Sequence, residues 1–262
     1  MRVELYSGAD NRFLLVEAAE RAREDWAAVA RAWCATPHFD GERPDGLLLL
    51  DTHGAAPRMV IYNADGTRPE ACGNGLRCVA WHFLRRDAVP QVIVDTDAGA
   101  RLVRLVESVG DEARLFASMG AAEINVLPSE FSTDRDASSA HAVDIGNPHC
   151  VLRVDDERRA DVDGLGAALQ SSPEFPNGVN VGFLASREGA WHLRVFERGV
   201  GETAACGTGA CAAAATLAFE PGETTIHMRG GPLVVRRRAD GEVELFGPAR
   251  RCGALELEAP GA

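Results

Sequence analysis

Hydrophobic and polar residues alternate along much of the chain with the two-residue period that is typical of half-buried β-strands. From this alternation and from the β-branched residues, we predict strands at residues 2–6, 13–18, 47–51, 58–63, 91–96, 101–108, 113–119, 150–154, 179–184, 191–197, 224–228, 232–238 and 242–247. Stretches with a helical period are few by comparison. The pattern therefore indicates an α+β protein in which strands predominate.

Three stretches have the pattern or the position of a helix. The first, residues 18–34, carries apolar side chains at helical spacing, which are Trp26, Val29, Ala30 and Trp33. Residues 207–219 are almost all alanine, and a helix with hardly any polar face is expected to be buried. A helix is also expected after Cys72, so two of the three helices begin beside a cysteine.

The chain contains an internal repeat. Residues 60–75 align without a gap with residues 194–209, so that Cys72 matches Cys206. Each block reads as an apolar strand, a loop with glycine and acidic residues, and Cys-Gly-x-Gly at the start of a helix. Weaker matches lie in the same order at residues 8–16 and 146–154, and at residues 45–48 and 177–180. A repeat of this length indicates two fused, similar halves and not a solenoid.

The repeat also predicts where the halves begin and end. We expect residues 1–117 together with about 250–262 in the first half, and residues 118–249 in the second. Each half would hold many strands around one central helix, which Cys72 opens in the first half and Cys206 in the second.

The composition, 46% apolar and 25% charged among 262 residues, is that of an ordinary globular protein. The formal net charge of −12 disfavours binding to nucleic acid or to an anionic membrane. No run approaches the roughly 18 apolar residues of a membrane span, and the first residues lack a secretory pattern. Seven cysteines, an odd number, favour reduced thiols in the cytoplasm.

Lysine is absent from the sequence, because all 27 basic residues are arginine. A Schiff base with pyridoxal phosphate and the phosphate contact of a P-loop both need a lysine, so these two chemistries are excluded in their usual forms. No two cysteines have the Cys-x-x-Cys spacing of a zinc site. We therefore expect neither a cofactor nor a metal.

Each Cys-Gly-x-Gly turn places a thiol at the start of a helix, where unpaired N–H groups and the positive end of the dipole attract anions. Such positions lower the pKa of a thiol to about 3.5–7.5 in known cases. Two turns that face each other would hold a substrate carboxylate, with Cys72 and Cys206 on opposite faces of its α-carbon. One thiolate would remove the α-proton and the other thiol would return one, while the N–H groups stabilise the carbanion. The pattern predicts an amino-acid racemase or epimerase.

A single cysteine before Gly-x-Gly is more often a small buried residue than a catalyst. The matched duplicate reverses this preference for Cys72 and Cys206. The other cysteines lack the flanking glycines and are expected to be structural; they are Cys34, Cys78, Cys150, Cys211 and Cys252.

Several segments carry a family resemblance: residues 62–66, 71–78, 146–151, 179–183, 194–211 and 247–249. In these segments the sequence resembles the diaminopimelate epimerase family. The resemblance implies two pseudo-symmetric domains, each a highly curved, mostly antiparallel sheet around a central helix, with the active site in the cleft between them. It also implies a small-molecule substrate, LL-2,6-diaminopimelate, which is converted to the meso form for lysine and peptidoglycan synthesis. A homodimer is the assembly expected of the family.

The resemblance implies roles for individual residues as well. His149 and Glu197 would assist proton movement at the two catalytic thiols, Cys72 and Cys206. The residues expected to bind the substrate are Asn11, Asn63, Gly73, Asn74, Asn147, Asn180, Arg198, Gly207 and Thr208. The guanidinium of Arg198 suits the distal carboxylate of such a substrate, and the amides can both donate and accept hydrogen bonds.

The first loop departs from the family pattern. Residues 7–13 read Ser-Gly-Ala-Asp-Asn-Arg-Phe, where the family typically has His-Gly-x-Gly-Asn-Asp-Phe. The departures are Ser7, Asp10 and Arg12, whereas Asn11 is retained. They leave open a second hypothesis, a racemase of the same family that acts on another amino acid such as histidine.

A third hypothesis, of another class, is a non-enzymatic protein that binds an amino acid or senses oxidants through its two thiols. Incorporation of solvent deuterium at an amino-acid α-carbon would exclude a purely binding role. Turnover of other L-amino acids without turnover of diaminopimelate would favour the second hypothesis over the first.

Overall fold

The computed structural model describes residues 1–9, 11–17, 25–39, 41–54, 56–69, 72–133, 136–217 and 221–258. The chain forms two compact units. Unit 1 comprises Met1–Ser118 and Gly247–Ala262, and unit 2 comprises Met119–Phe246. Two strands, β7 (Glu112–Ala121) and β16 (Glu242–Glu256), have residues in both units.

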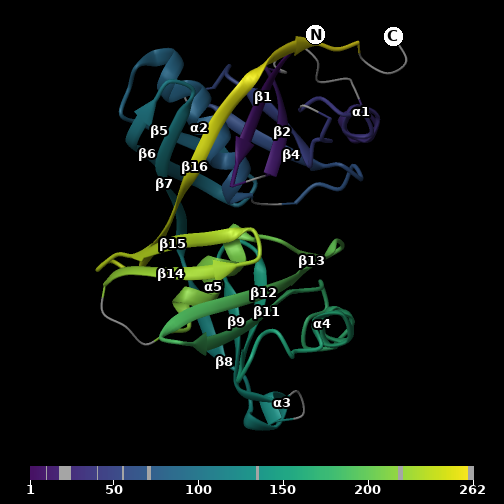
Figure 1. Ribbon diagram of the computed structural model, residues 1–262, viewed down its shortest axis with the longest axis vertical. Coiled ribbons are helices and arrows are strands. Elements are labelled where there is room, and N and C mark those ends of the chain that lie inside the picture. Colours follow the sequence, from purple (N-terminus) through teal and green to yellow (C-terminus); the bar gives the residue numbers. More distant parts are fainter. Residues whose placement is uncertain are drawn as a thin grey trace. The chain divides into compact units, whose positions relative to one another are not determined.

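Unit 1 is a sheet with one long helix packed against it. Its other strands are β1 (Arg2–Gly8), β2 (Asn11–Glu17), β3 (Gly46–Asp51), β4 (Arg58–Asn63), β5 (Gln91–Thr96) and β6 (Gly99–Val109), and its helices are α1 (Trp26–Cys34) and α2 (Gly73–Asp87). β1 pairs with both β2 and β16, and α2 contacts every strand from β1 to β6. The helix is therefore central to its unit. Figure 1 labels it α2 among these strands.

Unit 2 has the same plan around α5 (Gly207–Ala215). Its strands are β8 (Glu123–Val126), β9 (Ala137–Asp144), β10 (Pro148–Val154), β11 (Asn180–Arg187), β12 (Ala190–Glu197), β13 (Gly201–Thr203), β14 (Gly222–Met228) and β15 (Gly231–Arg237). Two further helices are α3 (Ser129–Thr133) and α4 (Val162–Gln170). α5 contacts β10, β11, β12, β14 and β15 (Figure 1).

The two units share an order of strand pairings. In unit 1, β2–β3 is parallel, β3–β4 antiparallel, β4–β5 parallel and β5–β6 antiparallel. In unit 2, β10–β11, β11–β12, β12–β14 and β14–β15 repeat that sequence of orientations. In each unit the long central helix follows the third strand of this series. The predicted α+β class, with two similar halves that each hold a mostly antiparallel sheet around one helix, is confirmed.

The registers of the ladders identify equivalent positions in the two units. Gly46 of β3 lies opposite Asn63 of β4. The register of β11 with β12 places Asn180 opposite Glu197 in the same way. Asn63 and Glu197 also match in the sequence repeat, since each stands nine residues before its motif cysteine. The carboxylate of Glu197 is therefore the counterpart of an amide in unit 1.

The residue that pairs with this position on the neighbouring parallel strand differs between the units. Phe13 of β2 pairs with Gly46 of β3, and His149 of β10 pairs with Asn180 of β11. The histidine of unit 2 is thus the counterpart of a phenylalanine in unit 1. The same registers show that both weaker sequence matches are wrong by two positions, that of residues 45–48 with 177–180 and that of residues 8–16 with 146–154. Short apolar blocks align almost equally well in neighbouring registers.

Both central helices are buried because the strands of their units surround them. α2 is buried from Gly73 to Trp81, and every residue of α5 is buried. The alanines of α5 have no bulk beyond Cβ, so strands can approach this helix on all sides. This confirms the buried helix predicted after Cys206.

Some predicted boundaries need correction. The helix after Cys206 ends at Ala215 and not at residue 219; Leu217 follows it in a turn, and residues 218–220 lie outside the described residues. Of the first predicted helix, α1 covers residues 26–34, with the predicted apolar face buried, and residues 18–24 also lie outside the described residues. The elements that the pattern did not predict are β8, β9, β13, α3 and α4.

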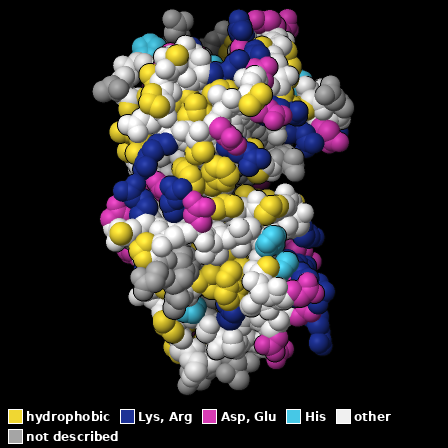
Figure 2. Space-filling view, turned by 60° about the vertical axis from the view of Figure 1, so that its left-hand side comes forward, with side chains coloured by type: hydrophobic (Ala, Val, Ile, Leu, Met, Phe, Trp, Pro, Cys, Tyr) yellow, Lys and Arg dark blue, Asp and Glu magenta, His cyan; other side chains and the backbone are white. Residues whose placement is uncertain are grey.

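No helix in the described part of the chain is long and apolar enough to cross a membrane. On the face drawn in Figure 2, basic and acidic side chains lie next to one another. The arginines at the end of β15 illustrate this, since Arg236 pairs with Glu223 at 2.7 Å and Arg238 pairs with Asp240 at 3.0 Å. The arginines at this strand end are therefore ion-paired with neighbouring carboxylates.

Candidate active site

The two motif cysteines are the N-caps of the two central helices. Both have extended backbone, with φ −149° and ψ 105° at Cys72 and φ −132° and ψ 111° at Cys206. The sulfur of Cys72 accepts a hydrogen bond from the N–H of Gly75 at 3.3 Å, and the sulfur of Cys206 accepts one from Gly209, also at 3.3 Å. The sequence repeat is therefore a repeat of local geometry, in which a thiol caps a helix in each unit.

The last glycine of each motif lets the helix lie close to the strands. A Cβ on Gly75 would lie 2.9 Å from Cδ2 of Leu48, and a Cβ on Gly209 would lie 3.0 Å from Cγ2 of Val195. The second of these would also lie 3.2 Å from the sulfur of Cys206. The spacing Cys-Gly-x-Gly thus follows from packing as well as from helix capping.

The first turn of each helix offers backbone donors. The N–H groups of Gly73 and Asn74 in α2, and of Gly207 and Thr208 in α5, precede the first bond of the helical ladder. They lie at the positive end of the helix dipole, which favours a negative charge. Each turn is therefore suited to hold a carboxylate beside a thiol.

The thiol of Cys206 lies in a polar but closed environment. It is 5% exposed, and the carboxylate of Glu197 accepts a hydrogen bond from it. The hydroxyl of Thr203 donates to Oε1 of Glu197 at 2.5 Å, and Thr208 lies with its Oγ1 3.5 Å from the sulfur. Thr203 was not among the predicted site residues, although it lies within the repeated block of residues 194–209.

Burial raises the pKa of the Cys206 thiol well above its ordinary value, and the charge of Glu197 raises it further. Hydrogen bonds from Thr208 and from the N–H of Gly209 act in the opposite direction but do not prevail. Burial also raises the pKa of Glu197. The expectation that a helix start lowers the thiol pKa is therefore wrong for Cys206, because loss of water and a neighbouring carboxylate outweigh the dipole.

His149 is connected to this thiol through two side chains. Its Nε2 lies 3.1 Å from Oδ1 of Asn147, whose Nδ2 donates to Oγ1 of Thr208 at 3.4 Å. Burial lowers the pKa of His149 to about 3, and the charge of Arg198 contributes. The imidazole is thus neutral at physiological pH, and its Nε2–H donates to Asn147. The structure places no direct contact between His149 and Cys206 among the hydrogen bonds of the described residues.

In unit 1, two predicted substrate-binding amides lie together. Nδ2 of Asn74 donates to Oδ1 of Asn11 at 2.6 Å. A Cβ on Gly8 would lie 2.8 Å from the carbonyl oxygen of Asn74, so the β1–β2 hairpin packs directly on the start of α2. Asn63 is engaged elsewhere, because its Nδ2 donates to Oγ1 of Thr67 at 2.9 Å.

In unit 2, Asn180 uses both ends of its amide on the backbone. Its Nδ2 donates to the carbonyl of Pro148 at 3.0 Å, and its Oδ1 accepts from the N–H of Arg198 at 3.0 Å. The half-buried Arg198 donates from its guanidinium to the carbonyl of Asn177 at 3.2 Å. In this structure Asn180 therefore holds the turn that carries Arg198.

The departures in the first loop are only partly within the described residues, because Asp10 lies outside them. Arg12 is tied to Asp45 by two bonds: its N–H donates to Oδ2 of Asp45 at 2.7 Å, and its carbonyl accepts from the N–H of Asp45 at 2.8 Å. Both bonds use the backbone of Arg12, so they do not depend on which side chain stands at this position.

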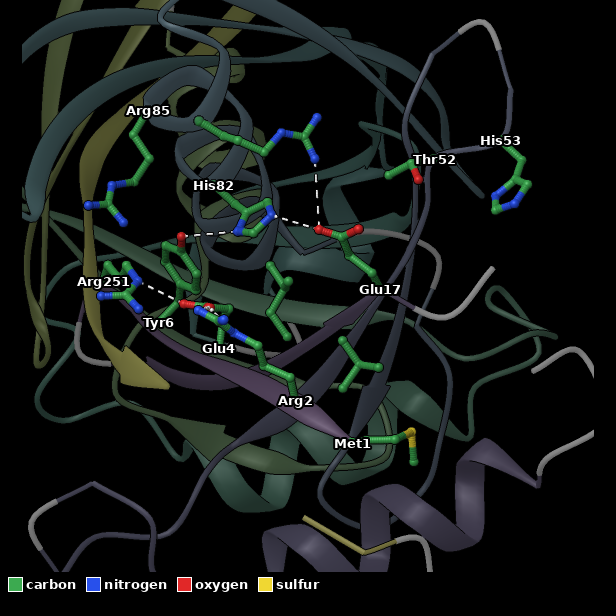
Figure 3. A pocket seen from close by; sticks show the side chains of 13 residues that line it. Met1, Arg2, Glu4, Tyr6, Glu17, Thr52, His53, His82, Arg85 and Arg251 are labelled. Carbon is green, nitrogen blue, oxygen red and sulfur yellow. Dashed lines mark hydrogen bonds and ion pairs between the residues drawn. The ribbon is translucent and has the colours of Figure 1, made fainter. Parts of the chain in front are cut away.

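A separate groove of about 970 Å³ lies on unit 1 (Figure 3), and Cys72 is not among the residues that line it. His82 stands at its centre, with Nδ1 3.2 Å from the hydroxyl of Tyr6 and Nε2 3.2 Å from Oε1 of Glu17. Arg251 donates to Glu4 beside them at 2.7 Å. Burial raises the pKa of Tyr6 and lowers that of His82. Sequence reasoning did not single out these residues, which come from distant segments.

No group of three or more His, Cys, Asp or Glu residues in the described ranges is placed to hold a metal ion. The arrangement in each unit is instead a thiol, backbone donors and polar side chains. That combination suits proton transfer next to a bound carboxylate.

Comparison with known proteins shows which sequences this chain resembles. The family model for diaminopimelate epimerase matches residues 3–124 and 141–252. A diaminopimelate epimerase of Geobacillus kaustophilus (strain HTA426) is 34% identical over 92% of this chain and 91% of its own length. Another, of Halorhodospira halophila, is 39% identical over 82% of this chain and 81% of its own length.

Solved structures with the same fold are more distant in sequence. A structure described as a predicted epimerase from Pseudomonas aeruginosa has a TM-score of 0.76 and 19% identity, with 98% of each chain covered. A hydroxyproline epimerase from Agrobacterium vitis has a TM-score of 0.64 and 14% identity, with 98% of this chain and 89% of that chain covered. At these identities the likeness shows the fold alone.

Proposed function

The chain belongs to the diaminopimelate epimerase family and is an isomerase of amino acids, and on that premise we propose that it converts LL-2,6-diaminopimelate to meso-diaminopimelate with two cysteines and no cofactor. The observation that carries this proposal is the matched pair of thiol caps. Cys72 and Cys206 have the same backbone conformation and accept the same hydrogen bond at the same distance.

In the proposed reaction, one thiolate takes the α-proton as the C–H bond breaks, and the electron pair passes to the α-carbon and its carboxylate. The opposite thiol then gives its proton to the other face of that carbon, which inverts the centre. N–H donors at the start of α2 and α5 stabilise the negative charge of the intermediate. Neither an oxidant nor a reductant is consumed.

The surroundings of Cys206 support a starting role as proton donor. The thiol is buried, it bonds to the carboxylate of Glu197, and its pKa is raised. After Cys206 has given up its proton, we infer that a proton returns to its thiolate by way of Glu197, whose carboxyl is hydrogen-bonded to this sulfur. Cys72, which is half-buried, would act as the base in that direction and as the acid in the reverse direction.

The remaining predicted residues would bind the substrate. We assign the reacting end to Asn11, Asn74, Gly73, Gly207 and Thr208, and the distal end to Asn63, Asn147, Asn180 and Arg198. Arg198 is positioned by Asn180 and offers a guanidinium, the group that binds a carboxylate in a two-pronged manner. A second amino-acid group at the far end of the substrate would meet this set.

We also propose a reducing compartment, the cytoplasm, because the seven cysteines are an odd number and are scattered along the chain. A homodimer is the assembly we expect of the family. Sedimentation of the purified protein at several concentrations measures it, and a monomer at every concentration would refute it.

The test of function uses the reduced enzyme with LL-diaminopimelate in deuterated water. We expect deuterium at one α-carbon together with the meso product. Turnover of histidine or another L-amino acid, with none of diaminopimelate, would transfer the mechanism to a different substrate. Binding of an amino acid without any α-deuterium would contradict the epimerase proposal.

A further inference from the structure

One fully buried cation in unit 1 has no part in the function proposed so far. The side chain of Arg77 is 0% exposed and lies one helical turn after Cys72. Its guanidinium donates to Oδ1 of Asn74 at 2.5 Å and to the carbonyl of Gly73 at 3.3 Å. Burying a charge is costly unless its hydrogen bonds are satisfied, so this placement needs a reason.

The same guanidinium also binds the strand that returns from the C-terminal end of the chain. Its Nε donates to the carbonyl of Pro248 at 3.2 Å. A Cβ on Gly247 would lie 2.7 Å from Cζ of Arg77, so the strand passes directly over the flat cation at a residue without a side chain. The Gly-Pro-Ala segment that the sequence analysis matched to the family, residues 247–249, is therefore the surface on which Arg77 rests.

A guanidinium donates hydrogen bonds and cannot accept them, which fixes the direction of the amides beyond it. Asn74 must turn its Oδ1 toward Arg77, and its Nδ2 then points toward Asn11. Asn11 must accept that bond with its own Oδ1. Its Nδ2 is consequently the end of the amide that remains directed away from this chain of bonds.

Unit 2 has a similar series of hydrogen bonds beside its central helix, but it begins at a different side chain. The position equivalent to Arg77 in the repeat is Cys211, which cannot play this part. There, Nε2 of His149 lies 3.1 Å from Oδ1 of Asn147, and Nδ2 of Asn147 donates to Thr208. Unit 1 has Phe13 at the place of this histidine. In each unit one buried basic side chain thus contacts Oδ1 of an amide near the helix start, Arg77 in unit 1 and His149 in unit 2, but only the guanidinium is restricted to donating.

We propose that Arg77 is a positioning residue that holds the Asn74 and Asn11 amides in one polarity, so that Asn11 presents N–H groups to an oxygen of the substrate. The assignment of that oxygen to an amino-acid carboxylate rests on the proposed function. The polarity itself does not depend on the substrate.

Kinetics of Arg77 variants test the positioning role. Arg77→Lys keeps a donor-only cation, whereas Arg77→Met removes it at similar length. We expect Arg77→Met to raise KM by about 10- to 100-fold, as for the loss of a charge-assisted bond, with a smaller change in kcat. Arg77→Lys should recover most of the KM, and Arg86→Gln, an exposed arginine of the same helix, should leave both constants unchanged. An equal loss in the Lys and Met variants, or a fall in kcat alone, would overturn the proposal.

A second measurement is made on the wild-type protein without turnover, and a variant is used only to assign the signals. In ¹⁵N-asparagine-labelled protein, with Asn74→Asp to assign the signals, one Nδ2 proton of Asn74 should exchange slowly because Asn11 accepts it inside the unit. Exchange of both protons as fast as in an exposed asparagine would overturn the polarity. Failure to turn over diaminopimelate would sink the proposed function and leave this result intact.

Discussion

The turns at Cys72 and Cys206 have nearly the same backbone and the same N–H···S bond, yet they differ in burial and in nearby charge. Cys72 is half-buried and has the buried cation of Arg77 in the first turns of its helix. Cys206 is buried and bonds to the carboxylate of Glu197.

This difference separates what the helix geometry demands from what the chemistry demands. Capping a helix with a thiol and bringing it close to its sheet requires a cysteine and a glycine at fixed spacing, so both units keep them. A reaction that removes a proton at one thiol and supplies one at the other requires unlike protonation states at rest. The duplicated halves have therefore kept their backbone and diverged in the groups that set charge.

The largest effect should come from removing the charge beside one thiol. Glu197→Gln should lower the pKa of Cys206, since the carboxylate raises it, and should slow epimerisation by about 100-fold because a proton-transfer partner is lost. Alkylation of Cys206 at fixed pH should become faster, whereas that of Cys72 should not change. Glu202→Gln, which removes a nearby carboxylate paired with Arg194, is the control. Unchanged turnover in Glu197→Gln would break the comparison.

Native reactivity of the two thiols sharpens the comparison without any mutation. Iodoacetamide should alkylate Cys72 at least about tenfold faster than Cys206, because Cys206 is buried and its thiolate is disfavoured. Peptide mass spectrometry follows each site, with the exposed Cys252 as an internal reference. Equal rates at Cys72 and Cys206 would contradict the unlike environments, and loss of activity should follow modification of Cys72.

A matched pair of glycine substitutions tests the part that the units share. Gly75→Ala and Gly209→Ala should each destabilise the protein by about 1–3 kcal/mol, since the added Cβ would meet Leu48 or Val195. Urea unfolding measures the change in the free energy of unfolding. We expect Gly209→Ala to affect activity more, because its Cβ would also press on the thiol. A neutral effect of both changes would refute the packing argument.

The smallest effect is expected for His149, whose counterpart in unit 1 is Phe13. The pKa of His149 falls to about 3 in the folded protein, so the unfolded chain binds one more proton between about pH 6.5 and 3. This contribution to the free energy of unfolding is complete above pH 6.5. As the pH falls below that value, it decreases by at most about 1.4 kcal/mol per pH unit. His149→Gln should therefore lose less stability than the wild type between pH 7 and 5. His53→Gln, at an exposed position, should behave as the wild type does.

The sequence was sufficient for the repeat, the two thiol caps and most strands, because these depend on local patterns. β4 and β5 lie where the alternation predicts them, at Arg58–Asn63 and Gln91–Thr96. The exposed strand β8 was missed because its four residues carry no buried face that would produce a pattern. α4 was missed because Gly164 and Gly166 weaken a helical signal that the tertiary packing restores.

Protonation could not be predicted from the motifs. A helix start predicts a lowered thiol pKa, but the burial of Cys206 and its bond to Glu197 depend on strands that are distant in sequence. The role of Arg77 was hidden for the same reason, since its carbonyl partner at Pro248 is 171 residues away. In both cases the missing information was tertiary.

The central claim is that each thiol serves one face of a single carbon, and the single-cysteine variants test it most directly. Cys72→Ala and Cys206→Ala would each be incubated with LL- and with meso-diaminopimelate in deuterated water. We predict that neither variant inverts the centre, and that each exchanges the α-proton of a different isomer with retention through its remaining thiol. Inversion by either variant, or exchange of the same isomer by both, would contradict the two-thiol account.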